Sequence, residues 1–283
     1  MKNLCYAALF LHPFPLVFGG LLPPAMDVAV LDGGTLVAGR DFLMWDGGIL
    51  RASEVGCDRF YRPTTSPDGR TVAVWAGSDH LNCVVLVGGN GVEIMGPYER
   101  AGLPCWDNQG NLWFTAEGSL LRNGAMSGHS LGVHHISVAP GADRLVFTDR
   151  QDRLLVMDMA SGNVDTLSTE YRFFGPIFVG DDIIVSPSLN GGIWMFKGSE
   201  AVYVDHGEQP AWWRERNSLV YIRTTDDGMN LTSSDIWTWT CEQRSRRLTD
   251  TPYILEINPT PAPDGVYFVD SFSGMLGFVE VPR

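Results

Sequence analysis

The sequence is poor in basic residues and has no cysteine pair of the C-x-x-C type. Over 283 residues, 20 Lys and Arg stand against 33 Asp and Glu, which gives a net charge of −13. An acidic surface repels phosphate backbones, so the composition argues against nucleic acid as a partner. Without C-x-x-C spacing, a thiolate zinc site or a thioredoxin-like centre is not expected. We therefore expect neither a metal nor a cofactor.

The five cysteines leave the oxidation state open. They are Cys5, Cys57, Cys83, Cys105 and Cys241. Buried free thiols are the favoured interpretation, because free cysteine behaves as a small hydrophobic residue. If Cys5 is lost with a cleaved signal, four cysteines remain. Oxidised pairing is then possible, and Cys57 and Cys83 are the nearest in sequence.

Only one long apolar stretch is present, at residues 1–22. Lys2 precedes the apolar run 4–18, and small residues near 19 offer a cleavage site, which is typical of a secretory signal peptide. Pro13 and Pro15 interrupt the run, and the alternative is a β-strand that closes the domain. No other segment reaches the roughly 18 apolar residues that a membrane helix needs. We expect export to the periplasm or cell surface, with no membrane span after processing.

Long helices are also missing from the pattern. The chain contains 32 Gly and 17 Pro, which punctuate strands and turns and leave little room for helices. Hydrophobic residues make up 45% and charged residues 19%, an ordinary globular balance. In the segment 235–241 polar and apolar residues alternate strictly, as in a half-buried strand. These features predict an all-β fold.

A short unit recurs along the chain: a first strand, a turn rich in Pro, Asp and Gly, and a second apolar strand. Six copies occur at 62–75, 103–114, 135–147, 175–185, 209–221 and 258–269, after a degenerate copy at 27–37. A period of about 40 residues with several strands per unit is the signature of a β-propeller. We predict seven blades of four antiparallel strands, with six as the alternative, in a single domain at 23–283. For one blade the expected strands are 136–138, 144–148, 154–159 and 164–168.

These units resemble the TolB-like, or WD40-like, propeller repeat of bacterial envelope proteins. The matching motifs are Ser-Pro-Asp-Gly-Arg at 66–70, Ala-Pro-Asp-Gly at 262–265, Val-Met-Asp at 156–158 and Arg-Leu-Thr at 247–249. The resemblance covers about 27–283. It implies a propeller, often periplasmic, that binds proteins. The N-terminal α/β domain of TolB has no counterpart here, so TolB's own role is not carried over.

One motif points to a different chemistry. Residues 128–132 match G-x-S-x-G, the nucleophile elbow of α/β-hydrolases, with Ser130 as the nucleophile. That elbow needs a buried strand before the serine and a helix after it. The repeat instead places Ser130 in the link between an outer strand and the next inner strand. A serine hydrolase is therefore only a remote alternative.

A ligand site is predicted where the first strands of the repeats line the central channel. Equivalent positions in the repeats are largely polar, whereas core positions would be apolar. We expect a polar or acidic segment to dock around Arg62 and His135. The full set of expected site residues is Arg62, His135, Gln209, Asn258, Tyr61, His134, Phe174 and Glu208.

The combined prediction is a monomeric, non-catalytic binding or scaffold module that recognises a protein or peptide partner. A rigid disc presents loop side chains at little ordering cost, which suits recognition. The alternative is a propeller enzyme acting on a carbohydrate or lactone at the channel. It would require carboxylates and histidines that converge with perturbed pKa values. We also expect residues 15–21 to add the missing outer strand of the last blade, if the N-terminus is retained.

Overall fold

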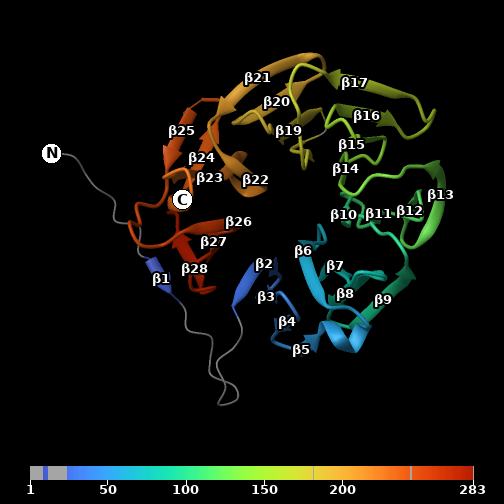
Figure 1. Cartoon of the computed structure of the whole chain (residues 1–283), viewed down its shortest axis with the longest axis horizontal. Helices are drawn as coiled ribbons and strands as arrows, with labels where there is room; N and C mark the ends of the chain where they lie inside the picture. Colours follow the sequence, from blue (N-terminus) through green and yellow to red (C-terminus); the bar gives the residue numbers. More distant parts are fainter. Residues whose placement is uncertain (1–8, 12–23, 181, 243, 283) are drawn as a thin grey trace. The chain divides into compact units, whose positions relative to one another are not determined.

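The structure is a computed structural model that describes residues 9–11, 24–180, 182–242 and 244–282. It consists of seven four-stranded antiparallel sheets, the blades of a seven-bladed β-propeller, and confirms the all-β prediction (Figure 1). The chain forms two compact units, Ala29–Asp205 and Met1–Val28 with His206–Arg283. The division falls inside strand β2.

The first five sheets follow one another along the chain. Their strands are β2 (Ala25–Leu31), β3 (Gly34–Gly39), β4 (Phe42–Trp45) and β5 (Gly48–Arg51); β6 (Arg59–Thr65), β7 (Thr71–Gly77), β8 (Asn82–Gly88) and β9 (Gly91–Tyr98); β10 (Cys105–Trp106), β11 (Leu112–Ala116), β12 (Ser119–Arg122) and β13 (Ala125–Ser130); β14 (Ile136–Val138), β15 (Arg144–Thr148), β16 (Leu154–Asp158) and β17 (Val164–Ser168); and β18 (Ile177–Phe178), β19 (Ile183–Pro187), β20 (Ile193–Lys197) and β21 (Glu200–Asp205).

The last two sheets belong to the unit that holds both ends of the chain. One contains β22 (Glu208–Trp213), β23 (Ser218–Asp226), β24 (Leu231–Thr240) and β25 (Arg244–Arg247), and the other β26 (Glu256–Ala262), β27 (Gly265–Asp270), β28 (Leu276–Glu280) and β1 (Leu9–Leu11). The outermost position beside β28 is thus taken by Leu9–Leu11. The range 15–21, expected in that position from the sequence, lies outside the described residues.

Turn chemistry explains why the predicted strand boundaries hold. In the fourth sheet β14, β15 and β17 have the predicted limits, and β16 ends one residue earlier, at Asp158. The Asp158 carboxylate accepts hydrogen bonds from the backbone N–H groups of Ala160 and Ser161 and from the Ser161 hydroxyl. This side-chain cap closes the hairpin that leads to β17. The only helices in the described residues are two short 3₁₀ turns, at Ala52–Val55 and Arg214–Arg216.

Neighbouring sheets pack face to face through apolar clusters. Between the sheets β6–β9 and β10–β13, for example, Trp75, Val84, Leu112 and Phe114 are buried together. The half-buried Trp106 packs on the same cluster, and its indole N–H donates to Thr64 O at 3.0 Å. Large aromatic side chains therefore fill the space between blades and join them. No helix in the described part of the chain is long and apolar enough to cross a membrane.

Candidate functional site

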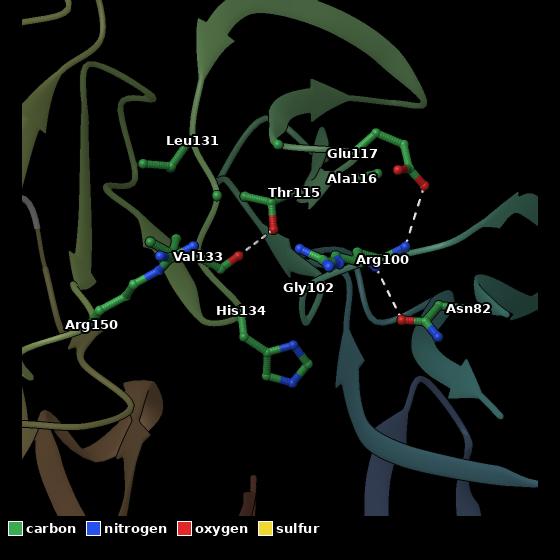
Figure 2. A pocket seen from close by; sticks show the side chains of 13 residues that line it. Asn82, Arg100, Gly102, Thr115, Ala116, Glu117, Leu131, Val133, His134 and Arg150 are labelled. Carbon is green, nitrogen blue, oxygen red and sulfur yellow. Dashed lines mark hydrogen bonds between the residues drawn. The ribbon is translucent and has the colours of Figure 1, made fainter. Parts of the chain in front are cut away.

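One end of three successive sheets in the Ala29–Asp205 unit carries a pocket of about 450 Å³, which we call the arginine pocket (Figure 2). Its walls come from the β9–β10 and β13–β14 links, from the β11–β12 and β15–β16 turns and from the start of β8. The lining residues are Asn82, Arg100, Ala101, Gly102, Thr115, Ala116, Glu117, Gly118, Leu131, Gly132, Val133, His134 and Arg150.

Hydrogen bonds join the β9–β10 link and the β13–β14 link to each other and to β11 beside this pocket. Gly102 N donates to Thr115 O at 2.8 Å, and Leu103 N donates to His134 O at 2.7 Å. The Thr115 hydroxyl donates to Val133 O at 2.5 Å. A Cβ atom at Gly102 would lie 2.4 Å from Thr115 Oγ1 and 2.6 Å from His134 O. Glycine is required there, because the two links approach too closely for any side chain.

Two guanidinium groups give the pocket its positive character. Figure 2 shows Arg100 and Arg150 entering from opposite sides. Neither side chain is in an ion pair with any residue that the structure describes. The one carboxylate of the lining, Glu117, accepts the backbone N–H groups of Glu99 at 2.6 Å and Arg100 at 3.3 Å. The Glu117 Oε1 oxygen is therefore directed at the backbone N–H groups and not at a guanidinium group. Both arginines remain available for an external anion.

Asn82 and His134 complete the polar groups of the pocket. Asn82 Oδ1 accepts Ala101 N at 3.1 Å, which leaves the amide nitrogen, a donor, for another partner. The His134 ring meets the Trp75 ring edge-on with centroids 6.0 Å apart. Burial lowers the pKa of His134, and a backbone hydrogen bond with Ala101 opposes that shift. Because the single N–H of the neutral imidazole is directed at the Ala101 carbonyl, its other ring nitrogen can only accept a hydrogen bond from a ligand.

Five of the predicted channel residues belong to this same unit: Tyr61, Arg62, His134, His135 and Phe174. Arg62 lies over the Tyr61 ring, 5.6 Å from its centroid, and both side chains are exposed. The half-buried His135 packs on Gly175, whose Cβ, if present, would lie 3.1 Å from the imidazole Cε1. Burial, together with the charges of Arg62 and His134, lowers the pKa of His135 to about 4.

The other predicted residues differ in their surroundings. Phe174 is exposed, at 41% of its surface. In the second unit the Glu208 carboxylate accepts the Thr224 hydroxyl at 3.2 Å. Gln209 Oε1 accepts Asn258 N at 2.6 Å, and the Asn258 amide donates to Met26 O at 2.7 Å. The amides of Gln209 and Asn258 thus tie inner strands to one another.

A β-bulge sets the direction of these inner-strand residues. Arg62, Gln209 and Asn258 all have φ of 52°, in the left-handed region. Each precedes a proline, and each lies where the register of the first strand pair shifts. A bulge re-aims the side chain relative to a regular strand. The repetition of the bulge in both units makes it an architectural feature of the repeat.

Ser130 has none of the surroundings of a nucleophile elbow. It ends β13, an outer strand with mostly exposed residues, and the next element is the strand β14. No three His, Cys, Asp or Glu side chains of the described residues lie together as a metal site would require.

Sequence reasoning did not find Arg100 and Arg150. They lie in a link and in a turn, outside the recurring Pro-Asp-Gly motifs. Their spacing of 50 residues, rather more than one repeat, gives no local signal.

Known structures match this architecture. The fold is that of a TolB-like β-propeller. One similar structure is titled "The structure of putative TolB from Agrobacterium tumefaciens", with 15% identity over 79% of this chain and 91% of that chain and a TM-score of 0.51. At this identity the similarity extends to the fold alone. No protein-family model and no curated protein matches the sequence.

Proposed function

We propose that this propeller is a non-catalytic binding module that recognises an acidic segment of a protein partner in the arginine pocket. The observation that carries the proposal is the convergence of Arg100 and Arg150, both without ion-pair partners among the described residues, in one pocket. Guanidinium groups bind carboxylates through paired, charge-assisted hydrogen bonds.

The acidic net charge of the chain does not oppose this assignment. At physiological ionic strength the Debye length is about 8 Å, so charges farther away are largely screened from a pocket ligand. Within the pocket two arginines face one carboxylate, and that carboxylate accepts backbone N–H groups. The local field therefore favours an anion. The Asn82 amide adds a neutral donor for another oxygen of a peptide segment, and the His134 ring adds an acceptor for a backbone N–H.

A second contact region for the same partner comes from Tyr61 and Arg62 of β6 and from His135 and Phe174, which lie in the links before β14 and β18. Arg62 supplies positive charge, and the exposed Phe174 supplies apolar surface. We propose that a bound segment engages this region in addition to the pocket. We also propose a location in the bacterial envelope, which is what the resemblance of the repeat motifs to those of envelope propellers implies.

The test is fluorescence anisotropy with a labelled peptide of alternating Glu and Gly, and with a matching Gln–Gly peptide. The wild type should bind the Glu peptide and not the Gln peptide. The double variant Arg100→Gln/Arg150→Gln should bind at least about tenfold more weakly, since each charged hydrogen bond contributes roughly 1.5–3 kcal/mol.

The control is Arg40→Gln/Arg246→Gln, which removes two exposed arginines outside the pocket and changes the net charge equally. It should bind as the wild type does. Equal weakening in both double variants would mean that only overall charge matters, and would reject the pocket as the site.

A further inference from the structure

Two cysteine thiols face each other inside the Ala29–Asp205 unit. Cys57 follows the 3₁₀ turn Ala52–Val55 in the link to β6, and Cys83 lies in β8. Their Sγ atoms are 3.6 Å apart, and the side chains are only 3% and 1% exposed. A disulfide requires about 2.05 Å between the sulfurs, so an approach of about 1.5 Å would form the bond.

The surroundings of the two thiols favour a covalent bond over another use. Both belong to an apolar cluster that includes Ala52, Phe60 and Ala76. Backbone hydrogen bonds from Cys57 N to Ala52 O and from Asp58 N to Gly77 O fix the link against the sheet. Neither cysteine is part of a group of three metal-ligating side chains in the described residues.

We propose that Cys57 and Cys83 form an intramolecular disulfide, made by exchange with a disulfide oxidant such as oxidised glutathione while the chain folds. The bond would tie the link between two blades to the third strand of the next blade. The proposal is independent of the arginine pocket and of any partner.

The exchange balances with glutathione disulfide as the oxidant. The Cys57 thiolate attacks the glutathione disulfide, and one glutathione leaves as its thiol. The Cys83 thiolate then attacks the Cys57 sulfur of the mixed disulfide, which forms the Sγ–Sγ bond and releases the second glutathione. The two electrons and the two protons of the cysteine thiols end on two glutathione thiols.

The timing follows from the reactivity of the thiols. Burial raises the pKa of Cys57, and burial raises the pKa of Cys83 to about 12, with the neighbouring Cys57 adding to the effect. The reactive thiolate is therefore scarce once the sheets have closed. Exchange should proceed before the link docks on β8 or during transient opening.

The experiment exposes the reduced full chain to a glutathione redox buffer in urea, then removes the urea and alkylates free thiols with iodoacetamide. Trypsin should release peptides 52–59 and 71–100, one with each cysteine. In the oxidised sample, mass spectrometry without reduction should find these two peptides linked and lighter by two hydrogen atoms. The melting temperature should rise by about 5–10 °C relative to the reduced protein.

Variants identify the bond. Cys83→Ala should lose both the linked peptides and the difference in melting temperature between oxidised and reduced samples. Cys241→Ser, which removes an exposed cysteine, should keep both. If Cys83→Ala fails to fold, Cys57→Ala serves the same purpose, and the linked peptides of the wild type remain decisive. Recovery of 52–59 and 71–100 as separate alkylated peptides, or a link between any other two cysteines, would overturn the proposal.

Discussion

Replacing Glu256 by glutamine tests how one buried carboxyl controls the stability of this protein near neutral pH. Glu256 begins β26 and is fully buried. Its carboxyl accepts Ile236 N at 2.9 Å, the Thr249 hydroxyl at 2.5 Å and the Thr251 hydroxyl at 2.8 Å. Burial nevertheless dominates and raises its pKa to about 7, although the threonine hydroxyls lower it.

The magnitude follows from the pKa difference between the folded and unfolded states. The carboxyl titrates at 4.5 in its ordinary state and at about 7 in the folded protein. Because the folded pKa is the higher one, the stabilising contribution of the protonated Glu256 carboxyl to the free energy of unfolding is fully present below pH 4.5. That contribution is lost as pH rises through 7. At about 1.4 kcal/mol per pH unit, the free energy of unfolding should fall by roughly 3 kcal/mol across that window.

Glu256→Gln replaces the carboxyl by a neutral group of similar shape that cannot ionise. We expect the variant to lose this pH dependence and to be more stable than the wild type at pH 8 by up to roughly 3 kcal/mol. Urea denaturation and melting curves between pH 4.5 and pH 8 measure the effect. Glu242→Gln, at an exposed position, is the control and should follow the wild-type profile. Parallel profiles for the wild type and Glu256→Gln would refute the reasoning.

Three further predictions concern the Ala29–Asp205 unit. Gly102→Ala should destabilise the protein by roughly 1–3 kcal/mol in urea denaturation, because its Cβ would clash with Thr115 and His134, whereas Gly132→Ala, with open space around it, should be neutral. His135 has a folded pKa of about 4, below the ordinary 6.5, so its stabilising contribution is present above pH 6.5 and is lost as pH falls through 4. In His135→Asn the melting temperature should therefore fall less between pH 6.5 and pH 4 than it does in the wild type. An equal fall in the variant would contradict the attribution of this acid sensitivity to His135. A fluorophosphonate probe should leave the wild type unlabelled, and Ser130→Ala should bind the Glu peptide normally; stoichiometric labelling of Ser130 would count against a non-catalytic module.

Local interactions explain why the repeat could be read from the sequence. Each blade needs a turn with Asp, Gly or Pro and an apolar second strand, and these signals lie within a few residues of one another. In the fourth blade the Asp158 cap closes its hairpin through residues two and three positions away. Such short-range chemistry predicted the blade number and the strand limits of the fourth blade, and it also placed Ser130 at the end of an outer strand and not in a nucleophile elbow.

Contacts between distant segments were decided only by the tertiary structure. The 3.6 Å approach of Cys57 to Cys83 depends on a link docking against a strand 26 residues away. The arginine pocket depends on Gly102, which lets two links approach closely, and on the β15–β16 turn, which brings Arg150 to the same cavity as Arg100. The strand beside β28 comes from Leu9–Leu11, because edge pairing depends on backbone hydrogen bonds that any sequence can make. The sequence by itself therefore determined the repeating blade, whose signals are local, and packing between blades decided which side chains meet.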